Sequence, residues 1–293
     1  MHLAATQIED GIMLDMTNEK NAFLSELSPA EHAALRGHLA PFELRVGQCL
    51  HYLGDSVEEV VFPHSGLIAM SMPLRDNPGA AAALIGRDGM VGALAALAGA
   101  PAASDAVVHI AGRASRLSAA AFRQVLDENP ALRRRVARHT HGLVAQSQQN
   151  ALCHAVHPVE ARICRWLLAI QTRCAGDKVP LTQSTLAQML GVRRTTVTLV
   201  AGRLEALGVI RCHRGYMQIV DQDELERRSC ECHAMLNGYV SKLLAASADG
   251  GGSVVVLTGT APPPDTAQQA SPLTIEPHRP SSRRASSRRA LCR

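Results

Sequence analysis

Two adjacent arginines and three threonines interrupt an otherwise apolar segment, LAQMLGVRRTTVTLV, at residues 186–200. An arginine can donate two hydrogen bonds to a guanine edge, and a threonine offers a hydroxyl together with a methyl that suits thymine. A segment that only filled a core would have no use for these side chains. The residue types therefore predict contacts with DNA bases, made by Arg193, Arg194, Thr195, Thr196 and Thr198.

Two helices joined by a glycine turn are expected to hold this segment. Thr182 can cap the first helix, and Gly191 permits a sharp turn because a positive φ costs glycine little. The second helix is predicted from about Arg194 to Leu207, where Gly208 ends it. In such a pair, the N-terminal end of the second helix enters the major groove of DNA.

The apolar spacing divides the second helix into two sides. At about 100° per residue, one narrow sector should face the core, and it holds Val197, Val200, Leu204 and Leu207. The opposite side carries Thr195, Thr198, Leu199 and Gly202. The next residues, VIRCHRGYMQIV, predict two short strands around a turn at Arg214 and Gly215. Helix, turn, helix and hairpin together predict a winged helix-turn-helix, with Arg214 as a further DNA contact.

The start of the first helix is expected to bind phosphate. Thr182 and Ser184 lie there, where hydroxyls and free backbone N–H groups are available. The plainer alternative is that the arginines are only solvated on a β-branched surface. That alternative would suit an isolated arginine pair, whereas the complete unit favours DNA binding.

The remaining chain predicts an α+β protein. Short apolar runs punctuated by glycines indicate a β-roll after a helix that begins with a capping box at Ser28 and Glu31. Only 3% of the residues are aromatic, so the core must be aliphatic. The predicted parts are a loose leader (1–20), a β-roll sensor domain of the cyclic-nucleotide-binding-like jelly-roll type (21–125), a long dimerisation helix (126–156), the winged helix-turn-helix (157–228), a C-terminal helix (229–245) and a disordered basic tail (246–293).

The long helix carries a mixed seam. Its apolar and polar members, near heptad positions, are Leu132, Val136, His139, Leu143, Gln146 and Asn150. Polar layers suit a helix that pairs with a second copy in a fixed register. The alternative is a helix that lies across its own β domain.

These motifs resemble those of the Crp/Fnr family of bacterial transcription regulators, over roughly residues 22–240. The most specific stretch is LTQSTLAQMLGVRRTTVTLVAGRLEALGVIRCHRG, and VVFPHSGLIAM and IGRDGMVG indicate a subgroup distinct from the cyclic-AMP-responsive members. The resemblance implies a homodimer, palindromic double-stranded DNA sites and, for an activator, contact with RNA polymerase. It also implies that Arg194 reads bases and that Thr182, Ser184 and Thr196 contact phosphate.

The recognition helix departs from the family pattern. Family members often carry Arg-Glu-x-x-x-Arg there, and Arg194 matches the first arginine. Thr195 replaces the glutamate, however, and Leu199 replaces the second arginine. The base preference should therefore differ from that of the best-known members.

The residues expected of a cyclic-nucleotide site are also missing. The family uses a Gly-Glu pair for the ribose and an arginine before Ser or Thr for the phosphate. Here Ala93 follows Gly92, and Ala103 precedes Ser104, with Asp105 placed to repel phosphate. Cyclic-nucleotide binding is not expected, and Gly86, Gly89, Gly92, Ala93 and Ser104 are left as candidates for another effector pocket or for a structural turn that closes the roll.

No cofactor is evident among the eight cysteines. An iron–sulfur cluster needs about four close thiolates, yet Cys49 is the only cysteine before residue 153. Cys230, Cys232 and His233 have the residue types of a zinc site but lack a second pair at the usual spacing. On one helix, positions 230 and 232 would point in different directions, so no metal is expected there.

Charge and motifs narrow the function classes. Residues 261–293 hold six arginines against Asp265 and Glu276, which accounts for the whole net charge of +4. No membrane span, signal peptide or enzyme motif is recognisable, so the sequence predicts a cytoplasmic regulator with reduced thiols that is not an enzyme. Two alternatives remain, a cyclic-nucleotide-responsive regulator and a winged-helix module that binds protein without direct gene control.

Overall fold

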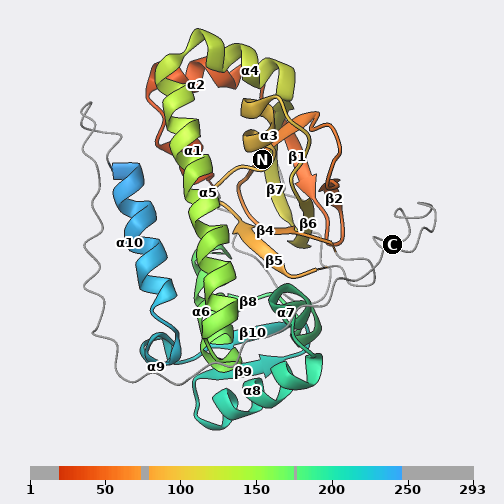
Figure 1. The fold of residues 1–293 in the computed structure, drawn as a ribbon, viewed down its shortest axis with the longest axis vertical. Helices are drawn as coiled ribbons and strands as arrows, with labels where there is room; N and C mark the ends of the chain where they lie inside the picture. Colours follow the sequence, from red (N-terminus) through yellow and green to blue (C-terminus); the bar gives the residue numbers. More distant parts are fainter. Residues whose placement is uncertain (1–19, 74–78, 175–176, 246–293) are drawn as a thin grey trace, which may run out of the picture.

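The computed structural model describes residues 20–73, 79–174 and 177–245 (Figure 1). The predicted basic tail and all but the last residue of the predicted leader lie outside the described residues. The N-terminal elements are α1 (Ala22–Ser25), α2 (Pro29–Arg36), β1 (Ala40–Leu44), β2 (Cys49–His51), β3 (Glu59–Pro63), β4 (Leu67–Ser71), β5 (Ala81–Ile85), α3 (Ala93–Ala98), β6 (Asp105–Ile110), β7 (Gly112–Ser118) and α4 (Ala119–Glu128). The C-terminal elements are α5 (Pro130–Val156), α6 (Val159–Cys174), β8 (Lys178–Val179), α7 (Gln183–Leu190), α8 (Arg194–Ala206), β9 (Ile210–His213), β10 (Tyr216–Ile219), α9 (Gln222–Arg228) and α10 (Cys232–Ala245).

The predicted β-roll is confirmed as two antiparallel sheets, ordered β1-β7-β3 and β2-β6-β4-β5. Alternating side chains of a strand point to opposite faces. On β3, Val61 therefore packs into the interior of the roll, whereas Val60 and Phe62 pack against the helical side. The predicted capping box is present as well, with Ser28 and Glu31 bonding each other's backbone N–H at the start of α2.

The predicted range of the long helix, 126–156, begins inside α4, and the helix itself, α5, begins at Pro130 and ends where His157 precedes Pro158. A residue before proline is disfavoured in the helical region, which explains the break. The seam proposed for pairing with a second copy, however, lies across the chain's own β domain. Leu132 and Val136 are fully buried against the roll.

Two polar residues of that seam, Gln146 and Asn150, bond to β5, which is an edge strand. The Gln146 side chain accepts a hydrogen bond from the backbone N–H of Leu84. Asn150 Nδ2 donates to the carbonyl of Ala82 at 2.7 Å. An edge strand presents backbone groups without a strand partner, so these side chains complete the edge. The dimer assignment of this particular seam was therefore wrong.

A different face of α5 is exposed. Its members recur at alternating spacings of four and three residues: Ala137, His141, Val144, Gln148, Ala151 and Ala155. We call these residues the exposed seam of α5. The face between this seam and the roll is covered by α10, which lies alongside α5 (Figure 1). No helix among the described residues has the length and apolar character needed to cross a bilayer.

The winged unit has a core that continues into the roll. Its sheet is ordered β8-β10-β9, and β8 was not predicted. The buried face of α6 contains Ile163, Trp166 and Ile170. The same apolar cluster also contains residues of β4, β5 and β6, namely Leu67, Ala69, Ala81, Leu84 and Ile110. The two parts of the molecule therefore share one core.

Candidate nucleic-acid interface

The turn between α7 and α8 sets the angle of the second helix. The Thr182 hydroxyl accepts from the backbone N–H of Thr185 at 3.1 Å, which confirms the predicted cap. Gly191 has a φ of +64°, in the left-handed region that favours glycine. A Cβ on Gly191 would lie 3.0 Å from the Cβ of Ala80, so the turn also packs closely on the roll.

The buried side of α8 agrees with the predicted sector except at one residue. Val197, Val200 and Leu204 are buried, together with Ala201. Leu207 is 57% exposed because the helix ends before it, at Ala206. The expectation that Leu207 faces the core was therefore wrong.

The opposite side of α8 is open to solvent at its N-terminal end. The exposed residues are Arg193, Arg194, Thr195, Thr198, Leu199 and Gly202, and Thr196 is half-buried. None of the ion pairs found among the described residues includes Arg193 or Arg194. The N-terminus of a helix carries a partial positive charge. Two arginines without acidic partners therefore stand where a polyanion would be attracted.

Gln183, which the sequence did not single out, holds this face in place. The Thr198 hydroxyl donates to Gln183 Oε1 at 2.8 Å, so it is already engaged within the protein. Gln183 Nε2 also contacts the Cys212 sulfur on β9 at 3.8 Å. The side chain thus joins both helices and the hairpin. Its position directly after the cap residue Thr182 gave no signal of this role.

The hairpin carries further cations. Gly215, with a φ of +87°, forms the predicted turn, and Arg214 beside it is exposed. The rings of His213 and Tyr216 stack with centroids 4.4 Å apart. Lys178 lies over the Tyr216 ring at 5.8 Å. The stacked rings and the added strand β8 stiffen the wing that presents Arg214.

The glycine turn considered as an effector pocket contains Gly86, Gly89 and Gly92, and other parts of the protein pack closely against it. A Cβ on Gly86 would meet the Arg173 side chain at 2.8 Å, and one on Gly92 would meet the Glu59 carbonyl at 2.5 Å. Gly89 faces His139 of α5. Ala93 is buried at the start of α3, and Ser104 is also buried. The turn therefore joins the roll to α5 and α6, as expected of the structural alternative.

Asp88, in this turn, interacts electrostatically with Arg173 of α6 and with His139 of α5. Arg173 forms an ion pair of 2.9 Å with Asp88. Burial lowers the pKa of His139, and the nearby Asp88 carboxylate partly opposes that shift. The His139 ring also packs edge-on against Phe23, with centroids 5.4 Å apart. A neutral imidazole at this junction suits its apolar neighbours.

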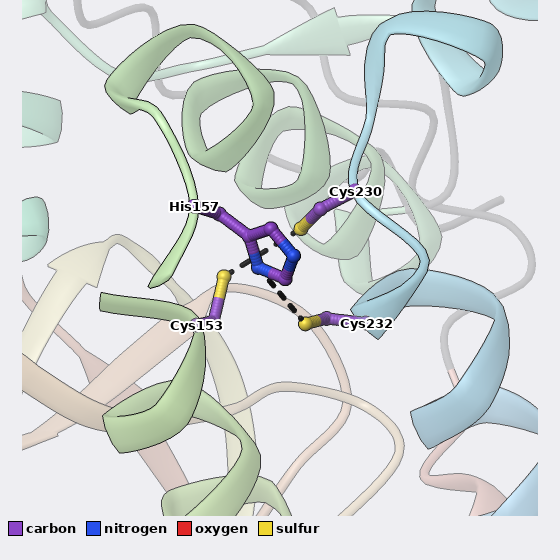
Figure 2. A group of neighbouring side chains, drawn as sticks. All are labelled: Cys153, His157, Cys230 and Cys232. Carbon is purple, nitrogen blue, oxygen red and sulfur yellow. Dashed lines mark hydrogen bonds between the residues drawn. The ribbon is translucent and has the colours of Figure 1, made fainter. Parts of the chain in front are cut away.

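The cysteines near the C-terminus do not lie as expected. Cys230 precedes α10, which begins only at Cys232, so the two residues do not share one helix. Their two sulfurs lie close to the Cys153 sulfur and the His157 imidazole (Figure 2). His233 does not belong to this group. The reasoning from helical directions, which set metal binding aside, was therefore wrong.

Comparison with known proteins agrees with this architecture. Residues 161–228 match the family model of Crp-like helix-turn-helix domains. Residues 161–228 therefore form a Crp-like helix-turn-helix domain. No curated protein sequence matches the chain.

Solved structures show the same fold at low sequence identity. FixK2 from Bradyrhizobium japonicum is 14% identical with a TM-score of 0.57, and the match covers 66% of this chain and 98% of that one. The CRP/FNR-family regulator TTHA1359 from Thermus thermophilus is 21% identical with a TM-score of 0.53, over 65% of this chain and 98% of that one. The c-di-GMP-responsive global regulator CLP of Xanthomonas campestris is 14% identical with a TM-score of 0.55, over 66% of this chain and 99% of that one.

Proposed function

We propose that the regulator binds specific DNA sequences as a homodimer, with α8 reading bases in the major groove. The observation that carries the proposal is the exposed, unpaired Arg193–Arg194 end of α8 in a Crp-like helix-turn-helix domain. Arg194 is assigned to a guanine edge, Thr195 to a neighbouring base edge, and Thr196 to phosphate. Thr182, Ser184 and Arg214 are assigned to phosphate. Thr198 supports the helix through Gln183.

Selection of bound DNA from a random pool tests this assignment. We expect an enriched palindrome with half-sites about one helical turn apart. Arg194→Ala should weaken binding to that palindrome by about 1–3 kcal/mol and relax the base choice at one position of each half-site. Arg45→Ala is the matched control, because Arg45 is an exposed arginine of the roll. Equal losses on every sequence would instead make Arg194 a phosphate contact.

The second copy is proposed to pair along the exposed seam of α5. Alanines at three of its positions allow two helices to approach closely, and His141 and Gln148 supply polar layers that specify register. Val144, 38% exposed, lies near the middle of the seam. An apolar side chain in a heptad pattern on a solvent-facing helix is typical of a pairing surface.

Light scattering after gel filtration tests the dimer. Val144→Glu should shift the protein from the dimer mass to the monomer mass, because two like charges would meet in the seam. Val46→Glu is the control, since Val46 is 68% exposed on the roll. A wild-type monomer at micromolar concentration, or a dimer that survives Val144→Glu, would contradict the assignment.

The β-roll is proposed as the sensor of a signal other than a cyclic nucleotide. Ala93 offers no carboxylate for a ribose, and the Asp105 carboxylate accepts a hydrogen bond from the Leu53 N–H at 2.7 Å near the expected phosphate position. DNA selection with and without cyclic AMP distinguishes the alternatives. A palindrome that emerges only with cyclic AMP would favour a cyclic-nucleotide-responsive regulator. Binding that is only salt-sensitive and blind to sequence would favour a protein-binding winged helix. RNA polymerase is the expected further partner if the regulator activates transcription.

A further inference from the structure

Three cysteines and one histidine from separate segments meet where α5 joins α6 (Figure 2). Cys153 lies in the last turn of α5 and His157 directly follows this helix. Cys230 lies between α9 and α10, and Cys232 is the first residue of α10. The three sulfurs and one imidazole nitrogen all lie within 4.8 Å of one another.

The spacing fits a single tetrahedral ion. Cys153 Sγ lies 3.5 Å from Cys230 Sγ, and Cys232 Sγ lies 3.5 Å from His157 Nδ1. A zinc ion with Zn–S bonds of about 2.3 Å holds sulfur ligands about 3.8 Å apart at tetrahedral angles. Three thiolates with one imidazole are also a common ligand set of structural zinc sites. We propose that Cys153, His157, Cys230 and Cys232 bind one zinc ion.

The surrounding groups orient these ligands as zinc sites require. A metal-binding histidine normally donates its second ring N–H to a carboxylate or carbonyl. Here Nδ1 of His157 faces the sulfurs, and Nε2 lies 3.2 Å from Glu231 Oε1. Gln149 Nε2 donates to Cys232 Sγ at 2.9 Å, a bond that favours the thiolate. Both supporting residues are therefore already in place.

The charge of the site is also balanced. Zinc with three thiolates carries a net charge of −1, which is costly to bury without a cation. Arg162, itself 7% exposed, interacts electrostatically with both Cys153 and Cys230. Its guanidinium also donates to the Leu190 carbonyl at 2.8 Å, at the end of α7. The site is thereby connected to the helix that precedes the Gly191 turn.

Ordinary core packing does not account for this group. Buried cysteines often act as small apolar residues among aliphatic neighbours. Here the buried cluster consists of Cys153, Cys230 and Cys232, with Ala161 packed against it. A disulfide between Cys153 and Cys230 would leave Cys232 and His157 unused. A cluster of several metal atoms would need its ligands farther apart than 4.8 Å.

The bound ion would fasten the start of α10 to the junction of α5 and α6. Cys153 and Cys230 are 77 residues apart in the chain, so the ion closes a long loop. Closing a long loop restricts the unfolded chain, and zinc binding then contributes directly to folding. Removal of zinc should accordingly lower the melting temperature and release α10 from α5.

Metal analysis of the full-length protein, purified in reducing buffer without chelator, tests the site. We expect one zinc per chain in the wild type, and loss of zinc in Cys153→Ser and Cys232→Ser. Cys49→Ser and His233→Asn are matched controls and should keep zinc, because neither residue belongs to the group. Iron in place of zinc, a Cys153–Cys230 disulfide without metal, or equal zinc content in ligand and control variants would overturn the proposal.

Two further measurements remain informative if a ligand variant fails to fold. Glu231 is exposed, so Glu231→Ala should fold and bind zinc about 10–100-fold more weakly in competition with a chromophoric chelator. Glu226→Ala, an exposed acid of α9, should leave that affinity unchanged. Cobalt(II) added to metal-free wild type should give intense tetrahedral bands with thiolate charge transfer. A weak octahedral spectrum would overturn the site.

Discussion

Replacing Asn150 by alanine should destabilise the junction between the roll and α6 more than any other single polar change on α5. Asn150 is 4% exposed and Arg165 is 3% exposed. The guanidinium of Arg165 donates to Asn150 Oδ1, and Asn150 Nδ2 donates to the Ala82 carbonyl at 2.7 Å. One amide therefore connects the edge of β5 to the first helix of the DNA-binding unit.

The expected magnitude follows from the two bonds that are lost. A hydrogen bond to a charged group contributes about 1.5–3 kcal/mol, and a neutral one about 1 kcal/mol. Asn150→Ala should therefore reduce the free energy of unfolding by about 2–4 kcal/mol. At about 2–4 °C per kcal/mol for a chain of this size, the melting temperature should fall by about 4–16 °C. Gln188→Ala, an exposed glutamine of α7, should change stability by no more than about 0.5 kcal/mol.

A double-mutant cycle separates the bond from general disruption. Arg165→Met alone should also destabilise, whereas the double variant removes the buried cation together with its acceptor. The double variant should therefore be more stable than the sum of the single effects predicts, by about 1–2 kcal/mol. Urea unfolding at one fixed protein concentration measures all four proteins, since dimerisation makes stability depend on concentration. Strict additivity, or an Asn150→Ala variant as stable as the wild type, would refute the reasoning.

Two more predictions concern His139, where α5 meets the roll, and Gly191, in the turn between α7 and α8. Burial lowers the pKa of His139 below its unfolded value of about 6.5, so the stability it contributes is present above that pH and is lost as the pH falls below it. His139→Gln should flatten the decline of melting temperature between about pH 6.5 and pH 5, and an unchanged slope would contradict this. Gly191→Ala should cost about 1–2 kcal/mol through its left-handed φ and should weaken specific DNA binding, as measured by urea unfolding and DNA titration. Gly202→Ala, where a Cβ would meet no atom within 4 Å, should instead stabilise the helix by up to about 1 kcal/mol, and a loss of stability at Gly202 would count against the argument.

Local signals explain why the helix-turn-helix could be predicted from the sequence. Thr182 and Gly191 fix the ends of α7 through a cap and a positive φ, which depend only on neighbouring residues. The period of Val197, Val200 and Leu204 likewise follows from one helix alone. Leu207 fell outside this reasoning because the helix ends at Ala206, and helix ends are set within one or two residues by competing bonds.

Long-range contacts account for what the sequence did not indicate. The polar spacing of Gln146 and Asn150 is the same whether they face a second helix or an edge strand, and only the position of β5 distinguishes the two. The convergence of Cys153 with Cys230 depends on the path of the chain through α6 to α9. A spacing rule for zinc ligands could not find it, because the cysteine pairs are split across 77 residues.

Because the roll and the winged unit share one core, the protein cannot be divided between them without exposing apolar surface. Leu67, Ala69 and Leu84 of the roll pack in the same cluster as the buried face of α6. A fragment that began at α6 would expose that apolar face to water, so it would need a replacement surface to remain soluble. Transferring the winged helix-turn-helix to another N-terminal domain would therefore require transferring the outer face of β4 and β5 with it. Packed cores move between discrete arrangements and do not deform smoothly. A change in the position of this sheet should therefore shift the winged helix-turn-helix in an all-or-none manner.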